Sequence, residues 1–166
     1  MSTNPPAFAN IPEQTARVAK SACPKGTLAM HLRDALAELS QHEHFAALNP
    51  IEGQPAYATW QLTLVTVLQY IENLTDQQAA DAARSRIDWK YALGLELTDP
   101  GFDPALLPAF RAHLLAKPAQ CQLLEQLLQI CKQHKWLGRK SRQRTDAIHI
   151  LTTITSLSPT PNGPEP

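Results

Sequence analysis

Residues 60–97 read WQLTLVTVLQYIENLTDQQAADAARSRIDWKYALGLEL and contain the most apolar helical stretch of the 166-residue chain. From Trp60 the apolar residues recur at the 3.6-residue spacing of a helix, and further apolar residues extend this stripe almost all the way round. Such a helix belongs in the middle of a bundle. Thr75 then predicts the start of a second helix, and Gln78, three residues later, completes a capping box. Two helices joined by so short a turn form a corner with the outline of a helix-turn-helix, and an ordinary helical hairpin is the alternative.

Helical spacing also precedes this stretch. The apolar positions between Leu28 and Leu39 recur every three or four residues, and Thr27 can cap the helix that they predict. This helix should pack on the central one. Residues 1–26 are rich in proline and alanine with little periodicity, so we expect a loosely ordered lead-in there.

Two more helices are expected after the central stretch. One can start at Asp103, but Pro108 follows five residues later, so this helix either begins late or kinks at the proline. The last long helix should open at Pro118 and end at Gly138. We therefore predict an all-α fold of about five helices in residues 27–138.

A long run of motifs surrounds and follows the predicted corner. In chain order these are Leu74-Thr75-Asp76, Gln78 to Ala83, Arg84 to Leu95, Asp99 to Asp103 and Phe110-Arg111. In this order and near this spacing they resemble the N-terminal domain of DDE-type insertion-sequence transposases of the InsH-like group. The resemblance covers roughly residues 32–151. It implies a helical domain that binds the DNA ends of an insertion element.

The charge distribution is uneven along the chain. Lys and Arg number 15 and Asp and Glu number 15, a balance that taken whole argues against a nucleic-acid binder. However, a segment between Glu125 and Asp146 carries six basic residues and no acid, namely Lys132, Lys135, Arg139, Lys140, Arg142 and Arg144. One basic segment on an acidic body indicates a surface that contacts phosphates, and a solvated linker is the alternative.

The predicted corner supplies further candidate DNA contacts. Three basic residues there are predicted to contact phosphates, namely Arg84, Arg86 and Lys90. Gln77 and Gln78 are the predicted base readers, because a glutamine amide can form two hydrogen bonds with adenine. Asp76 and Asp81 lie on the same predicted helix and argue against deep insertion into a groove.

Asp146 is the one candidate catalytic residue. The β-branched residues that follow it, from Ile148 to Ile154, predict a strand. By the resemblance, Asp146 matches the first acid of the Asp-Asp-Glu triad in a ribonuclease-H-like domain, where three carboxylates hold two Mg²⁺ ions. Ala147 and Ile148 replace the Ser and Thr of the family pattern. After Asp146 the only remaining acid is Glu165, and one carboxylate cannot form a two-metal site.

These features predict a chain cut short after its N-terminal domain. Residues 139–155 would be a basic linker and a vestigial, poorly ordered strand, and residues 156–166 a disordered, proline-rich tail. Transposition chemistry is not expected of this chain alone, and whether it is an enzyme stays open. The predicted function is binding of insertion-element DNA. The alternatives are a dimerisation module that inhibits a full-length transposase through mixed oligomers, or a decayed relic without activity.

Composition excludes several other classes. Cys23, Cys121 and Cys131 are odd in number and lack CxxC spacing, which favours a reduced, cytoplasmic chain over a disulfide framework or a zinc knuckle. No apolar run approaches the roughly 20 residues that span a bilayer, and the first residues lack a signal peptide. A membrane partner is therefore not expected.

Overall fold

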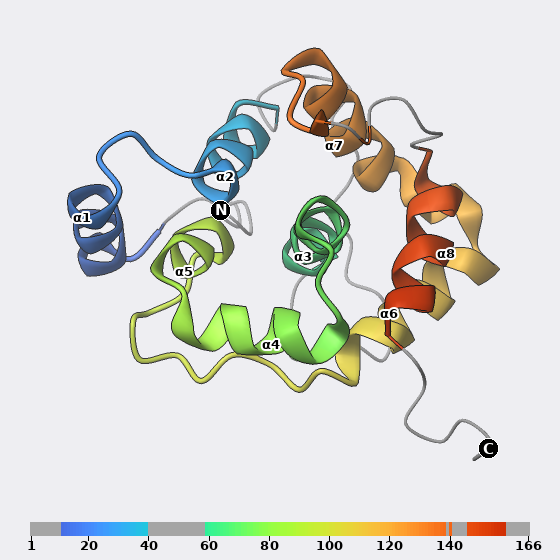
Figure 1. Ribbon diagram of the computed structural model, residues 1–166, viewed down its shortest axis with the longest axis horizontal. Coiled ribbons are helices and arrows are strands. Elements are labelled where there is room, and N and C mark those ends of the chain that lie inside the picture. Colours follow the sequence, from blue (N-terminus) through green and yellow to red (C-terminus); the bar gives the residue numbers. More distant parts are fainter. Residues whose placement is uncertain (1–10, 40–58, 139, 141–145, 159–166) are drawn as a thin grey trace, which may run out of the picture.

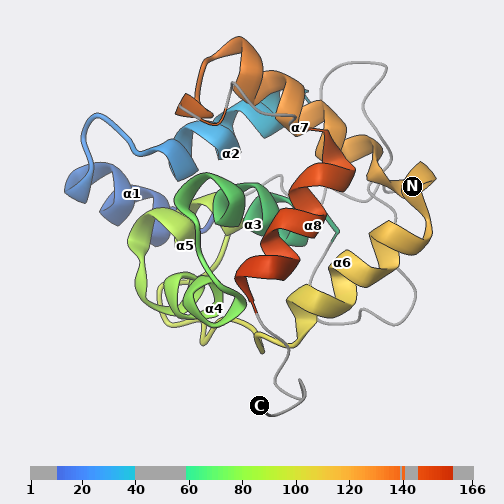
Figure 2. The same cartoon turned by 45° about the vertical axis from the view of Figure 1, so that its right-hand side comes forward.

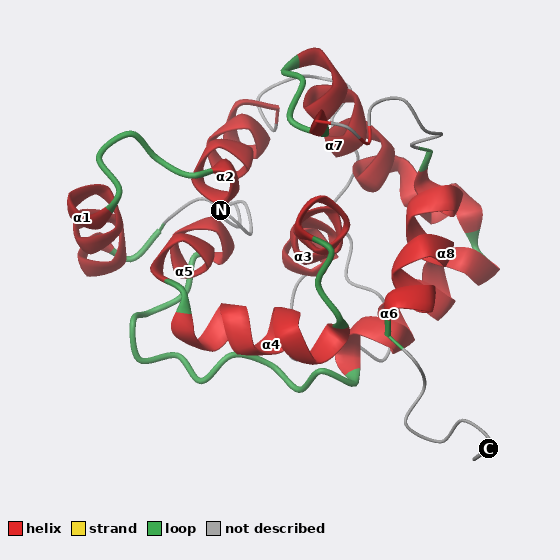
Figure 3. Cartoon of the chain, in the orientation of Figure 1, coloured by secondary structure: helices red, strands yellow, loops and turns green. Residues whose placement is uncertain are grey.

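The computed structural model describes residues 11–39, 59–138, 140 and 146–158 (Figure 1). These residues form eight α-helices and one short 3-10 helix, and no strand occurs among them (Figure 3). In chain order the elements are α1 (Glu13–Ala22), α2 (Leu28–Leu39), α3 (Thr59–Glu72), α4 (Asp76–Ser85), α5 (Ile87–Leu93), α6 (Leu106–Ala116), η1 (Pro118–Cys121), α7 (Gln122–Gln133) and α8 (Ala147–Leu157). The all-α prediction is confirmed for this part of the chain, with more helices than the five expected.

Helix α3 is the centre of the fold. Figure 1 looks nearly along it and shows the other helices arranged around it. Its residues from Trp60 to Tyr70 are buried apart from the half-buried Gln61, as the apolar stripe predicted. Two buried threonines within it satisfy their hydroxyls locally, since Thr63 and Thr66 each donate to the carbonyl four residues earlier at 2.8 Å. Each of these two threonine hydroxyls therefore has a hydrogen-bond partner within the core.

The corner between α3 and α4 forms as its sequence predicted. Asn73 adopts a positive φ of 60°, a conformation that asparagine tolerates well, and it ends α3. The Thr75 hydroxyl accepts a hydrogen bond from the Gln78 backbone N–H at 3.1 Å, and the Gln78 side chain accepts one from the Thr75 N–H at 2.9 Å. This capping box is confirmed. A short turn between two helices does not by itself define a DNA-binding helix-turn-helix.

The helices after the corner begin and end at different residues from those expected. Helix α6 begins at Leu106, so Pro108 occupies its third position, where a missing N–H leaves no intrahelical bond unmade. The late start is confirmed and no kink is needed. The last long helix was expected to run from Pro118 to Gly138. Instead, the 3-10 helix η1 covers its first four residues, and α7 ends at Gln133.

Part of the predicted lead-in is a helix. Helix α1 packs on α5, and a second small core joins α1, α2 and α5 through Ala19, Met30 and Tyr91. The buried Thr15 hydroxyl donates to the Leu95 carbonyl at 2.7 Å and ties α1 to the chain beyond α5. Residues 13–22 therefore belong to the fold, while residues 1–10 lie outside the described part.

The strand predicted after Asp146 is wrong, because residues 147–157 form α8. Its buried residues, Ala147, Ile150, Leu151 and Ile154, recur at helical spacing and pack against α3, α6 and α7 (Figure 2). Asp146 caps the helix, and Thr155 bonds its hydroxyl to the Leu151 carbonyl at 2.8 Å. Such bonds let β-branched residues occupy a helix, so tertiary burial overrides their strand propensity. The expected tail at 159–166 lies outside the described residues.

A buried ion pair fixes the start of α4 against α6 and α8. The guanidinium of Arg111 donates to both carboxylate oxygens of Asp76, at 2.7 and 2.9 Å, and to the Thr155 hydroxyl at 3.1 Å. Gln69 donates to the same carboxylate at 2.9 Å, and Ser158 accepts from the Asp76 backbone N–H at 2.7 Å. Four helices therefore meet at Asp76, which holds the corner in one orientation.

Candidate nucleic-acid interface

The exposed face of α4 carries little net charge. Gln77, Gln78, Asp81, Arg84 and Ser85 point to solvent, while the alanines of the opposite face pack inward. Asp81 lies at the centre of this face, where it accepts from Gln77 at 3.2 Å and from Arg84 at 2.8 Å. The one basic residue of the face is therefore paired with the one acid. The Gln78 side-chain oxygen is used by the capping box, which leaves Gln77 as the less constrained of the two predicted base readers.

Arg86 lies between two acids. Its guanidinium donates to Glu72 at 2.6 Å and to Asp88 at 2.9 Å, and it lies over the Trp89 ring at 5.5 Å from the centroid. Burial alone would lower the pKa of Arg86, but hydrogen bonds and opposite charges from Asp88 and Glu72 outweigh it and raise the pKa. The charge of Arg86 is therefore balanced within the protein, although the side chain stays 40% exposed.

Lys90 does not lie on the surface. Its side chain is buried, and the ammonium donates to the carbonyl oxygens of Ala83 at 3.1 Å and Asp99 at 2.6 Å. Burial lowers the pKa of Lys90, and the negative charge of Asp99 partly opposes this shift. Lys90 therefore joins α5 to the end of α4 and to the loop at Asp99. It was predicted to contact phosphate, but its side chain is directed into the protein.

Two of the six basic residues after Glu125 are exposed at the end of α7. Lys132 lies in the last turn of the helix, and Lys135 lies two residues beyond its end with a positive φ of 59°. The backbone N–H of Trp136 donates to the Cys131 carbonyl at 2.9 Å, and that of Lys135 to the Lys132 carbonyl at 3.2 Å. These bonds form a Schellman cap, which places both ammonium groups at the negative end of the helix dipole.

Lys140 brings the basic segment to the helical corner. Its ammonium donates to the Asn73 side-chain oxygen at 2.7 Å and lies 4.3 Å from the centre of the Tyr70 ring. Burial lowers the pKa of Lys140. Two features that are 67 residues apart in the sequence therefore touch. The remaining predicted phosphate contacts, Arg139, Arg142 and Arg144, lie outside the described residues.

A cluster of aromatic rings lies beside these lysines and was not predicted. The ring of His134 lies 4.4 Å from that of Trp136 at 13°, and the His31 ring of α2 lies 6.4 Å from it at 18°. Both histidines are exposed, and Trp136 is half-buried. The closeness of residues 134 and 136 could have been a signal, but their approach to His31 depends on the packing of α2 beside α7.

Asp146 has a structural role at the start of α8. Its side chain accepts from the His149 backbone N–H at 3.1 Å, and Glu125 of α7 accepts from the Ala147 N–H at 3.0 Å. Among the described residues no three His, Cys, Asp or Glu side chains cluster closely enough to hold a metal ion. These described residues therefore do not fit the Mg²⁺ site that the resemblance implies. The truncation expected from the sequence stays a prediction.

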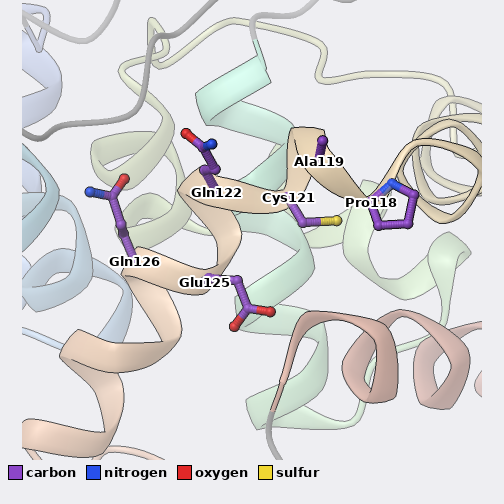
Figure 4. A pocket seen from close by; sticks show the side chains of 6 residues that line it. All are labelled: Pro118, Ala119, Cys121, Gln122, Glu125 and Gln126. Atoms are coloured by element: carbon purple, nitrogen blue, oxygen red, sulfur yellow. The ribbon is translucent and has the colours of Figure 1, made fainter.

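The described surface also has two hollows. One, of about 420 Å³, lies where η1 meets α7 and is lined by Pro118, Ala119, Cys121, Gln122, Glu125 and Gln126 (Figure 4). Burial, followed by the charge of Glu125, raises the pKa of the Cys121 thiol, so this cysteine is not an activated nucleophile. The other, of about 570 Å³, lies at the start of α4 beside Pro104 and Pro108.

Comparison with known proteins gives one family. The family described as Transposase domain (DUF772) matches residues 17–113, which is more than half of the chain. No curated protein and no solved structure matches the chain. The matched residues include the corner, Arg86, Lys90 and the Asp76–Arg111 pair, and they stop before α7 and α8. Within the described residues no helix has the length and apolar character needed to cross a membrane.

Proposed function

The chain belongs to the Transposase domain (DUF772) family, and from this premise we propose that its helical domain binds the DNA ends of an insertion element. The contact surface of this proposal combines the basic residues that follow Glu125 with the corner between α3 and α4. Its described members are Lys132, Lys135, Lys140 and Gln77. Arg139, Arg142 and Arg144 stay predicted phosphate contacts from the sequence alone and lie outside the described residues.

The observation that carries the proposal is the contact between Lys140 and Asn73. A basic segment alone can be a solvated linker, and a helical corner alone can be an ordinary helical hairpin. Their contact at 2.7 Å supports a single surface on which cations flank a helix end. Since backbone phosphates supply most of the affinity and the register of a protein on DNA, a surface of this kind needs little charge on α4 itself.

The geometry also narrows the residues that can take part. Arg86 is balanced by Glu72 and Asp88, and Lys90 is buried, so neither supplies a free cation to the surface. Arg84 is exposed but paired with Asp81. Phosphate contact is therefore assigned to the residues after Glu125, and base reading to Gln77. Insertion of α4 deep into the major groove is not part of the proposal, because Asp81 lies at the centre of its exposed face.

The test is a salt titration of the purified chain on labelled duplexes that carry the inverted repeats flanking its gene, with scrambled duplexes of the same length. A triple variant, Lys132→Gln, Lys135→Gln and Lys140→Gln, should bind more weakly. For every lysine that binds a phosphate, its neutralisation should reduce the slope of log affinity against log salt by roughly 0.9. The matched control neutralises three lysines elsewhere, Lys20, Lys25 and Lys117, which are all exposed.

The outcomes separate clearly. Preference for the repeats, weakened in the first triple variant and retained in the control, supports a DNA-binding domain with this surface. Equal weakening by both variants indicates a general charge effect and rejects the surface. Absence of binding to either duplex at low salt rejects DNA binding altogether. A circular dichroism spectrum that matches the wild type excludes unfolding as the cause.

The dimerisation alternative has no specific observation in its favour. Among the described residues Ile148 is the one large apolar side chain that is exposed, at 39%. Obligate dimers generally bury a broad apolar area. Sedimentation of the purified chain tests this alternative, since a monomer at micromolar concentration argues against mixed oligomers with a full-length transposase.

A further inference from the structure

Within the described part of the chain, three helices end with a residue in the left-handed conformation. These residues are Asn73 after α3, Gly94 after α5 and Lys135 after α7, with φ of 60°, 68° and 59°. In each case the next residue donates its N–H to the carbonyl five positions earlier, at 3.0, 2.9 and 2.9 Å. Glycine and asparagine are the residues that favour this position, because a side chain with a normal Cβ is strained there. Lys135 is therefore the exception among the three.

Lys135, the residue in the strained conformation, lies among other exposed side chains at the end of α7. Lys132 is exposed one turn earlier on α7, and His134, between them, is exposed as well. The His134 ring stacks on Trp136 at 4.4 Å, and Trp136 also packs against the main core. The stack is therefore held by the fold, and His134 is its exposed end on α7. No acid occurs between residues 126 and 145, so no carboxylate of this segment opposes a phosphate.

We propose that this cap of α7, formed by Lys132, His134 and Lys135 with Trp136 behind them, binds an unpaired DNA strand. The two ammonium groups contact backbone phosphates, and the exposed His134 ring stacks on a base. A base in a duplex has both faces covered by its neighbours, whereas an unpaired base offers a face to a ring. The inference rests on the proposed DNA-binding function and adds to it the kind of DNA that this patch prefers.

Lys135→Gly makes an unusually clean test of this patch. It removes one cation and installs the residue that the left-handed cap favours, so the fold should be kept or stabilised. We would measure binding of the wild type and this variant to two labelled DNAs with the same duplex sequence. One DNA is blunt-ended, and the other carries a single-stranded extension of about five nucleotides.

The expected results differ between the two DNAs. The wild type should bind the extended DNA more tightly, and Lys135→Gly should lose most of that preference. The salt slope on the extended DNA should fall by roughly 0.7, the value for one phosphate contact on a single strand. His134→Ala should weaken binding to the extension by about fivefold or more, as expected for one stacked base. Lys135→Arg should restore binding, and Lys25→Gln, at an exposed lysine of the α1–α2 turn, should leave it unchanged.

Other outcomes overturn the inference. If the wild type binds the blunt and extended DNAs equally, the preference for unpaired strands is rejected while DNA binding stands. If Lys135→Gly leaves the preference intact, the patch is rejected as its source. If the wild type binds neither DNA at low salt, the proposed function itself fails, and this inference fails with it.

Discussion

Removing one partner of the Asp76–Arg111 pair should destabilise the whole domain. The pair is almost fully buried, with 3% of the Arg111 side chain and 13% of the Asp76 side chain exposed. Both hydrogen bonds between them are short, at 2.7 and 2.9 Å. Arg111→Met keeps an unbranched apolar stem but leaves the Asp76 carboxylate without its counter-ion, although the Gln69 amide still donates to it.

The magnitude follows from the cost of an uncompensated buried charge. Breaking a buried ion pair by removing one partner costs about 3–5 kcal/mol. The remaining bond from Gln69 and the position of Asp76 in the first turn of α4 offset part of this, so we expect about 3 kcal/mol. For a chain of this size that corresponds to a melting temperature lower by roughly 6–12 °C. Asp76→Asn leaves the guanidinium without its counter-ion and should cost a similar amount.

Chemical denaturation of the two single variants and the double variant, followed by circular dichroism, measures the coupling. The double variant should lose at least about 1.5 kcal/mol less than the sum of the single losses, because neither buried charge is left alone. The exposed pair Arg84–Asp81, with 61% and 52% of its side chains exposed, is the control. Its removal should cost no more than about 0.5 kcal/mol. Additive losses at Asp76 and Arg111, or equal effects for the two pairs, would refute the reasoning.

Three further predictions concern other parts of the core. Burial, together with a hydrogen bond to Asp34, raises the pKa of Tyr91 to about 12. An unfolded tyrosine ionises near pH 10. The stability that the protonated Tyr91 contributes is therefore complete below about pH 10 and is lost as the pH rises through about 12. An ultraviolet titration of the wild type should show this late ionisation, and the Tyr91→Phe variant should lack it. A variant that titrates like the wild type would contradict the raised pKa of Tyr91. A thiol reagent should modify the half-buried Cys23 quickly and reach Cys121 and Cys131 only on unfolding, because both are buried and burial raises the pKa of Cys131 to about 12. Ending the chain at residue 145 removes α8 and should abolish cooperative unfolding, and a sharp transition in that variant would show that α8 is dispensable.

The central part of this fold could be predicted because its signals are local. The stripe that begins at Trp60 defines a helix buried on all sides, and Thr75 with Gln78 defines the start of the next one within four residues. No partner elsewhere in the chain is needed to interpret either pattern. The late start of α6 follows in the same way from the chemistry of Pro108.

Helix α8 could not be predicted from composition because two local signals disagree there. The residues from Ile148 to Ile154 are mostly β-branched, which favours a strand, yet the buried positions within α8 have helical spacing. Burial against α3, α6 and α7 decides between them. The resemblance to a catalytic domain also favours a strand at these residues. In the structure, however, Asp146 caps a helix.

In the candidate site, too, some features follow from the local sequence and others depend on packing. Composition located the cations, but it could not say which of them are already paired. The partners of Arg86 include Glu72, fourteen residues earlier, and those of Lys90 lie on two other segments. The contact of His31 with Trp136 depends on the packing of two helices. Free cations can therefore be separated from structural ones only after the chain is folded.

The position of α8 shows that the basic segment connects two helices of one domain. The sequence suggests a linker between two domains, but α7 before it and α8 after it pack on the same central helix. Glu125 of α7 binds the first backbone N–H of α8, and Lys140 binds the corner at Asn73. The residues on either side of 141–145 are therefore anchored to one core. Lys140, the described basic residue next to this segment, therefore contacts a corner that begins at the same central helix, so its proposed phosphate contact needs no second domain to position it.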